Sequence, residues 1–168
     1  MDLRSAFEWL DVNLPGAVFL RESVYGFAAL LAAHVVTMCL FLGLIIVMDL
    51  RLVGIGNRRI PFSELQRTLF PWQMLGMALV SITGLLLFYA QPLHYYGKAF
   101  FWLKMALMIV AGINALVFHL TTYRSVAVWD TKPFLPFAAK VAGVVSLVTW
   151  AGVVITGRLV AYSWLTYE

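Results

Sequence analysis

The sequence is poor in charged residues and nearly devoid of cysteine. Asp, Glu, Lys and Arg make up 12% of the 168 positions, about half of their share in ordinary soluble domains. Cys39 is the single cysteine, so one chain can form neither an internal disulfide nor a cluster of thiolate ligands. The sequence also lacks a Walker phosphate loop, a GxSxG nucleophile turn and an HExxH zinc motif. Together these absences indicate a membrane protein without a common hydrolase or nucleotide-binding signature.

The basic residues lack the arrangement that nucleic-acid binding needs. The formal net charge is +4 and the sequence pI is about 9.4, yet the sequence contains no basic helix, zinc-finger spacing or aromatic–basic alternation. In membrane proteins, Lys and Arg concentrate in cytoplasmic loops. We therefore expect the lipid bilayer, and no nucleic acid, as a partner.

Long apolar runs dominate the sequence. Hydrophobic residues make up 62% of it and the mean hydropathy is +0.89. A helix needs about 20 apolar residues to cross a bilayer, and four runs reach that length, at residues 24–48, 69–89, 100–120 and 141–162. Because lipid offers the backbone no hydrogen bonds, these runs must be helices. The short joints predict one all-α domain, residues 1–168, folded as an integral membrane antiparallel four-helix bundle.

The N-terminal residues carry a different pattern. Over residues 2–11, Leu3, Phe7 and Leu10 share one helical face, while charged side chains occupy the others. This pattern predicts a short interfacial helix lying on the membrane surface. The same segment is too polar for the apolar core of a cleavable signal peptide.

The distribution of Lys and Arg predicts an orientation. The joints after the first and third spans carry seven basic residues, against four near the opposite helix ends. Because basic residues are retained on the cytoplasmic side, both termini are expected outside the cytoplasm, with the protein in a bacterial inner membrane. The seven residues are Arg51, Arg58, Arg59, Arg67, Arg124, Lys132 and Lys140.

Three ionisable side chains lie within the predicted spans: His34, Lys104 and His119. Such groups are costly in a bilayer, so each is a candidate functional residue. His34 lies near the middle of the first span, where a neutral imidazole suits an axial ligand of haem iron, another metal or a proton relay. A hydrogen bond to a neighbouring helix suits it equally well. Asp49, Arg51 and Arg158 lie near helix ends, where their side chains can reach the membrane surface.

The third span places several candidates on one helical face. Lys104, Met108, Ala111, Ala115 and His119 recur at spacings of three and four residues. The alanines permit close helix packing or leave room for a flat ring. Lys104 then reaches the surface or pairs with an acid such as a haem propionate, and Met108 offers a sulfur ligand. His119 lies on the order of 10 Å or more from His34 in depth, so ligation of one haem by both histidines would be strained.

Three segments carry a resemblance to known families: "HVVTMCLFLGLIIVMDLRLVG", "LFPWQMLGMALVSITGLLLF" and "FFWLKMALMIVAGINALVFH". They resemble uncharacterised bacterial four-helix membrane proteins, and are similar to CopD-type membrane domains and to the small haem-containing membrane protoporphyrinogen oxidases. The shared elements are a His on the first helix (His34), a Thr-Gly step (Thr83 and Gly84), and a Trp-x-x-Lys element followed by a His, which correspond here to "FWLK" with Trp102 and Lys104, and to His119. The resemblance implies haem b on His34, with Lys104 and His119 in supporting roles. The "MDLRL" step departs from the oxidase pattern.

Several functions follow as expectations, and enzymatic activity is left open. The first is a membrane b-type haem protein that passes electrons between quinone and a partner, or anchors a larger oxidoreductase. The second is a structural or assembly subunit without a cofactor, within a complex or a homo-oligomer. The third is a porphyrin-oxidising enzyme. Copper handling ranks last, because clustered His, Met or Cys at matched depth are lacking.

Overall fold

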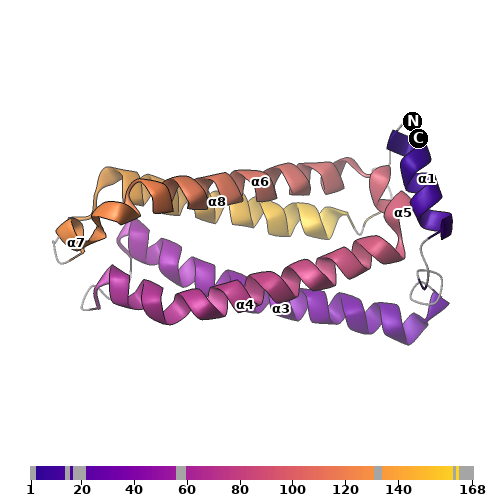
Figure 1. The fold of residues 1–168 in the computed structure, drawn as a ribbon, viewed down its shortest axis with the longest axis horizontal. Helices are drawn as coiled ribbons and strands as arrows, with labels where there is room; N and C mark the ends of the chain where they lie inside the picture. The colour runs from indigo at the N-terminus through magenta and orange to yellow at the C-terminus, as the bar shows by residue number, and fades with distance from the viewer. Residues whose placement is uncertain are drawn as a thin grey trace.

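The computed structural model describes residues 3–13, 16, 22–55, 60–130, 134–160 and 162. Within these residues the chain is helical and forms no strand. The elements are α1 (Leu3–Asn13), α3 (Val24–Val53), α4 (Phe62–Ala90), α5 (Pro92–Tyr96), α6 (Ala99–Leu120), a 3₁₀ turn η1 (Tyr123–Ser125), α7 (Val126–Trp129) and α8 (Phe137–Leu159) (Figure 1). The prediction of an all-α protein is confirmed.

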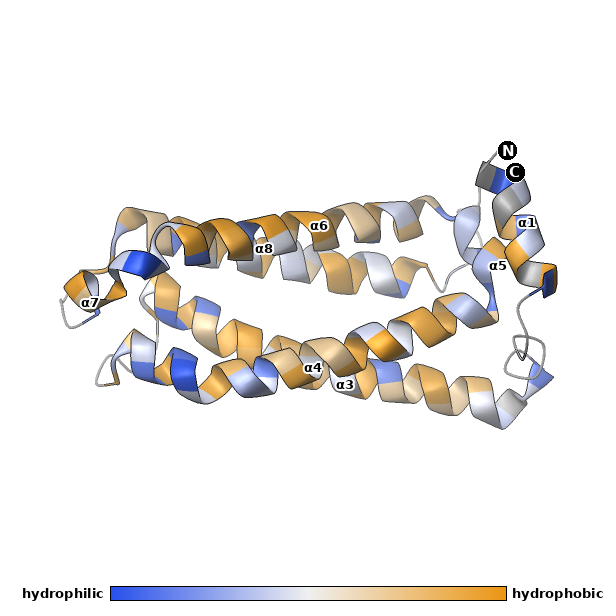
Figure 2. Cartoon of the chain, in the orientation of Figure 1, coloured by the Kyte–Doolittle hydropathy of each residue, from blue (hydrophilic) through white to orange (hydrophobic). Residues whose placement is uncertain are grey.

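Four helical stretches are long and apolar enough to cross a membrane, as predicted: Tyr25–Val53, Phe62–Ala90, Ala99–Trp129 and Phe137–Leu159. Figure 2 shows hydrophobic residues along the length of these helices and hydrophilic residues gathered near their ends. The chain is therefore a multi-pass membrane protein. α1 is a separate short helix at one end of the bundle, as predicted for residues 2–11.

The bundle is assembled from two helix pairs. α3 packs on α4, α6 packs on α8, and α3 joins the pairs by packing on α8, whereas α4 and α6 are scarcely in contact. α1 and α5 pack together at one end, here called the α5 end, and α7 lies at the other, here called the α7 end (Figure 1). The Phe7 ring of α1 lies 4.9 Å from the ring of Tyr96 and 5.8 Å from that of Phe88. These contacts hold α1 against the bundle.

The helices extend beyond the apolar runs that predict them. α3 continues past residue 48 to Val53, where Gly54 ends it with a φ of 100°, a conformation that glycine adopts without strain. α4 begins at Phe62 rather than residue 69, and α8 begins at Phe137 rather than residue 141. Hydropathy marks the part of a helix that lies in lipid. It does not register polar first turns such as Ser63–Arg67, which continue the same helix.

The start of α4 is held by a side chain from another element. The carboxylate of Asp130, at the end of α7, accepts hydrogen bonds from the backbone amides of Phe62 and Ser63 and from the Ser63 hydroxyl. The first amides of a helix have no intrahelical partner, and a negative charge there also complements the helix dipole. Asp130 therefore fixes the joint after α7 to the start of α4.

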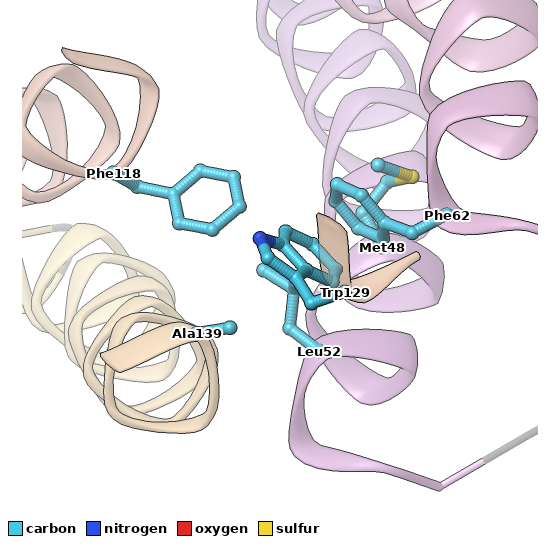
Figure 3. Packing of buried hydrophobic residues seen from close by; sticks show 6 residues of the cluster. All are labelled: Met48, Leu52, Phe62, Phe118, Trp129 and Ala139. Carbon is cyan, nitrogen blue, oxygen red and sulfur yellow. The ribbon is translucent and has the colours of Figure 1, made fainter. Parts of the chain in front are cut away.

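A hydrophobic cluster fills the bundle at the α7 end. It combines residues of α3, α4, α6, α7 and α8 (Figure 3). Phe62 is 1% exposed, and its ring contacts those of Phe118, Tyr123 and Trp129. Trp129 adds a hydrogen bond from its indole nitrogen to the Thr122 carbonyl, at 3.1 Å. The cluster consists of Met48, Leu52, Phe62, Phe118, Trp129 and Ala139.

Replacing Asp130 by alanine is expected to lower the free energy of unfolding by about 1–2 kcal/mol, because the helix-capping acceptor is lost. Thermal unfolding of the purified protein in detergent measures the effect. Glu64→Ala is the control, because Glu64 lies in the same helical turn with an exposed side chain. Equal melting temperatures for Asp130→Ala and the unmodified protein would contradict this role of Asp130.

Candidate functional site

His34 of α3 is hydrogen-bonded to α4. Its Nδ1 lies 2.9 Å from the Thr83 hydroxyl oxygen. That hydroxyl lies 2.8 Å from the Leu79 carbonyl oxygen and 3.1 Å from the Val80 carbonyl oxygen. When the hydroxyl donates to one of these carbonyls, its oxygen accepts from His34 and the imidazole proton lies on Nδ1. Nε2 then carries the lone pair, and the Val80 carbonyl is a further hydrogen-bond partner of the ring.

Gly84 supplies the space that the His34 ring occupies. A Cβ atom at this position would lie 3.1 Å from His34 Cε1, closer than an ordinary contact. The Thr-Gly step of α4 thus has two roles, since Thr83 accepts the ring proton and Gly84 lets the ring approach the helix backbone. The structure therefore places His34 against Thr83 and Gly84, the Thr-Gly step of the family resemblance.

Lys104 of α6 lies in the same region of the bundle. Its positive charge acts on the His34 ring, and its Nζ lies 3.5 Å from a Cβ built at Gly157 of α8. Lys104 makes no hydrogen bond or ion pair to the residues that the structure describes. Lys98 differs, because its Nζ donates to the Val160 carbonyl at 2.8 Å. His34 and Lys104 therefore place an imidazole and an amine in the same region of the bundle.

His119 has both ring nitrogens occupied. Nδ1 lies 2.8 Å from the Ala115 carbonyl oxygen, which can only accept, so Nδ1 carries the proton. Nε2 then accepts from the side-chain amide of Gln66 at 3.5 Å. The rings of Phe118 and Tyr123 lie 5.5 Å and 5.4 Å from the imidazole. His119 is thus fully paired within the α7 end.

The two histidines lie too far apart to share one haem. His34 bonds to Thr83 and His119 bonds to Gln66, and both partners are on α4. Seventeen residues of helix separate Gln66 from Thr83, which corresponds to about 25 Å at 1.5 Å per residue. The separation exceeds the sequence-based estimate. His119 therefore does not join His34 as the opposite axial ligand of one haem.

The inward face of α6 also differs from the predicted stripe. Met108 is 41% exposed and Ala115 is exposed, so neither lies on the face that packs within the bundle. The inward positions follow a spacing of three then four residues, typical of a helix seam. They are Lys104, Leu107, Ala111, Asn114 and Phe118; Leu107 packs beside Gly152, and Asn114 donates to the Ala142 carbonyl at 3.0 Å.

Asp49 and Arg51 are both buried within the bundle. Each is 6% exposed. The Arg51 guanidinium turns toward the joint after α3 and donates to the Ile60 carbonyl at 3.3 Å. The Asp49 carboxyl group faces Ser146 of α8. The apolar residues around "MDLRL" gave no sign of this burial.

His94, in α5, is exposed at the α5 end. Partial burial of the ring, and then the charge of Lys98, lower the pKa of His94, so its ring is neutral at pH 7. Elsewhere in the described residues, no three His, Cys, Asp or Glu side chains gather into a set that could hold a metal ion. His34 is the histidine whose ring nitrogen remains available inside the bundle.

Residues 6–163 match the model of DUF6644, a family of unknown function. The chain belongs to the DUF6644 family. No curated protein and no solved structure matches it. The candidate site is therefore defined by the geometry of this DUF6644 chain's own residues.

Replacing Gly84 by leucine in this DUF6644 protein is expected to destabilise it by about 1–3 kcal/mol, because the new side chain overlaps the His34 ring. Gly112→Leu is the matched control, since a Cβ there meets no atom within 4 Å. Thermal unfolding of both variants tests the assignment. Equal stability of the two would show that the His34 ring does not depend on Gly84.

Proposed function

We propose that this DUF6644 protein is a membrane b-type haem protein, with His34 as the axial ligand of the iron. The supporting observation is the state of the His34 ring. When Thr83 accepts the Nδ1 proton, beside the Val80 carbonyl, Nε2 carries a lone pair that could bind the iron. Histidines that bind metals commonly donate their other ring N–H to a fixed acceptor, which sets the tautomer and the ring orientation.

The surrounding residues suit the same ligand. Thr83 holds the imidazole in one orientation, with Nδ1 occupied and Nε2 left for the iron. Lys104 places an ammonium group in the same region, where it would pair with a haem propionate. Bound haem would supply one-electron chemistry. Because His119 is paired elsewhere, His34 is the one histidine of the bundle interior that this chain offers to the iron.

We extend the proposal to electron transfer between quinone and a partner protein in a bacterial inner membrane, with both termini outside the cytoplasm. The excess of Lys and Arg in the joints after the first and third spans supports this orientation. A lipid-embedded haem can exchange electrons with quinone, which dissolves in the same bilayer. The partner subunit and the porphyrin-oxidising alternative remain predictions.

The histidines provide a direct test. The protein purified from a haem-replete bacterial membrane is expected to show a Soret band and a reduced-minus-oxidised spectrum typical of haem b. His34→Ala should lose both. His94→Ala and His119→Ala are the matched controls and should keep them, because neither residue contributes the ligand. Loss of the spectrum in His119→Ala alone would overturn the assignment of His34.

A structural subunit without a cofactor is the second candidate, and the same hydrogen bond favours it. The His34–Thr83 bond joins α3 to α4 inside the membrane, and such bonds contribute about 0.6 kcal/mol on average. On this account His34→Ala would change stability slightly and the purified protein would carry no haem at any level of expression.

Thr83 separates the two candidates. In a haem protein, Thr83→Val removes the acceptor of the Nδ1 proton and should weaken haem binding by about 10–100-fold. Thr83→Ser keeps the acceptor and should bind haem normally. Titration of haemin into the apoprotein, followed by absorbance, measures both affinities. Equal affinities for Thr83→Val and Thr83→Ser would contradict the role given to Thr83.

A further inference from the structure

Asp49 is a buried acid that the haem site does not use. It lies four residues before the end of α3 at Val53, about 6 Å inside the α7 end of the helix. The residue is 6% exposed. Its Oδ2 is fully buried and has no hydrogen-bond partner within the described residues. Two carboxylate oxygens normally accept several hydrogen bonds between them, so this acid is poorly suited to carry a charge here.

The groups around Asp49 supply one hydroxyl and no cation. From α8, the Ser146 side chain hydrogen-bonds the carboxyl group and Gly143 packs against the Asp49 backbone. Arg51, on the same helix, directs its guanidinium to Ile60. The described residues contain one ion pair, Arg4–Glu8, which lies on α1.

The other charged or titratable groups at this end supply no cation to Asp49. Lys140 of α8 and Arg67 of α4 have exposed side chains. His119 of α6 is occupied by Gln66 and Ala115. An ionised carboxylate that is buried without a cation, and with one oxygen unpaired, costs several kcal/mol or more, and such a group takes up a proton instead.

We propose that Asp49 is a proton-binding site inside the α7 end of the bundle, a neutral carboxylic acid that exchanges its proton with the aqueous phase at that end. The proton adds to one carboxylate oxygen and leaves from the same oxygen, and Ser146 offers a hydroxyl beside it. Asp130 is the contrasting acid, because its carboxylate accepts from two backbone amides and a hydroxyl. The inference does not depend on haem binding.

Dicyclohexylcarbodiimide, an apolar reagent for protonated carboxyl groups in membranes, tests the assignment. The acid proton passes to a carbodiimide nitrogen, the carboxylate adds to the central carbon, and acyl migration gives a stable N-acylurea. Peptide mass spectrometry of the treated protein should find the adduct on Asp49 at neutral pH, with labelling that declines at alkaline pH. Asp130 and Glu64 should remain unlabelled. Asp49→Asn should lose the adduct and still fold, since an amide closely matches the neutral acid.

Infrared difference spectroscopy removes any dependence on reagent access. The spectrum of the unmodified protein minus that of Asp49→Asn, at neutral pH, should contain the carbonyl stretch of a protonated carboxylic acid. Melting temperatures of the two proteins should agree at that pH. A carboxylate band in place of the acid band, or a marked loss of stability in Asp49→Asn, would overturn the proposal.

Discussion

Polar groups inside a bilayer have to find partners within the protein, and this constraint governs the whole bundle. The backbone satisfies it by forming helices. Most polar side chains of the interior satisfy it by donating to a backbone carbonyl. Gln73 of α4 donates to Leu44 of α3 at 3.3 Å, Asn114 of α6 to Ala142 of α8 at 3.0 Å, and Thr156 to Gly152 within α8 at 2.7 Å. Two of these bonds tie one helix to the next.

Departures from this rule point to function. Within the described residues, His34 has a lone pair on Nε2 when Nδ1 donates to Thr83, Lys104 makes no hydrogen bond, and Asp49 has an unpaired Oδ2. The first two lie together toward the α5 end, and Asp49 lies at the α7 end. His119 is also a histidine on an apolar helix, but both of its ring nitrogens are paired. It is therefore not a candidate ligand. A residue's type suggests chemistry, and its remaining hydrogen-bonding capacity decides whether that chemistry is available.

The sequence was sufficient for the architecture and only partly for the site. Apolar length predicted four spanning helices, and the amphipathic N-terminal segment predicted α1, because lipid leaves the backbone few choices. Helix starts were missed, since Asp130 caps α4 from a distant part of the sequence. The stripe on α6 was wrong at Met108 and Ala115, because a spacing of three or four residues allows two neighbouring faces and only packing against α8 selects one. Asp49 was missed because its burial depends on Gly143 and Ser146 of α8.

The central claim is that the His34 ring, fixed by Thr83, binds the iron of one haem. The most direct measurement is the haem content of the purified protein, determined by the pyridine haemochrome assay and divided by the amount of chain. The account predicts a ratio near one haem per chain after expression with haem available. A ratio near zero, for protein that is folded and remains able to unfold cooperatively, would contradict it.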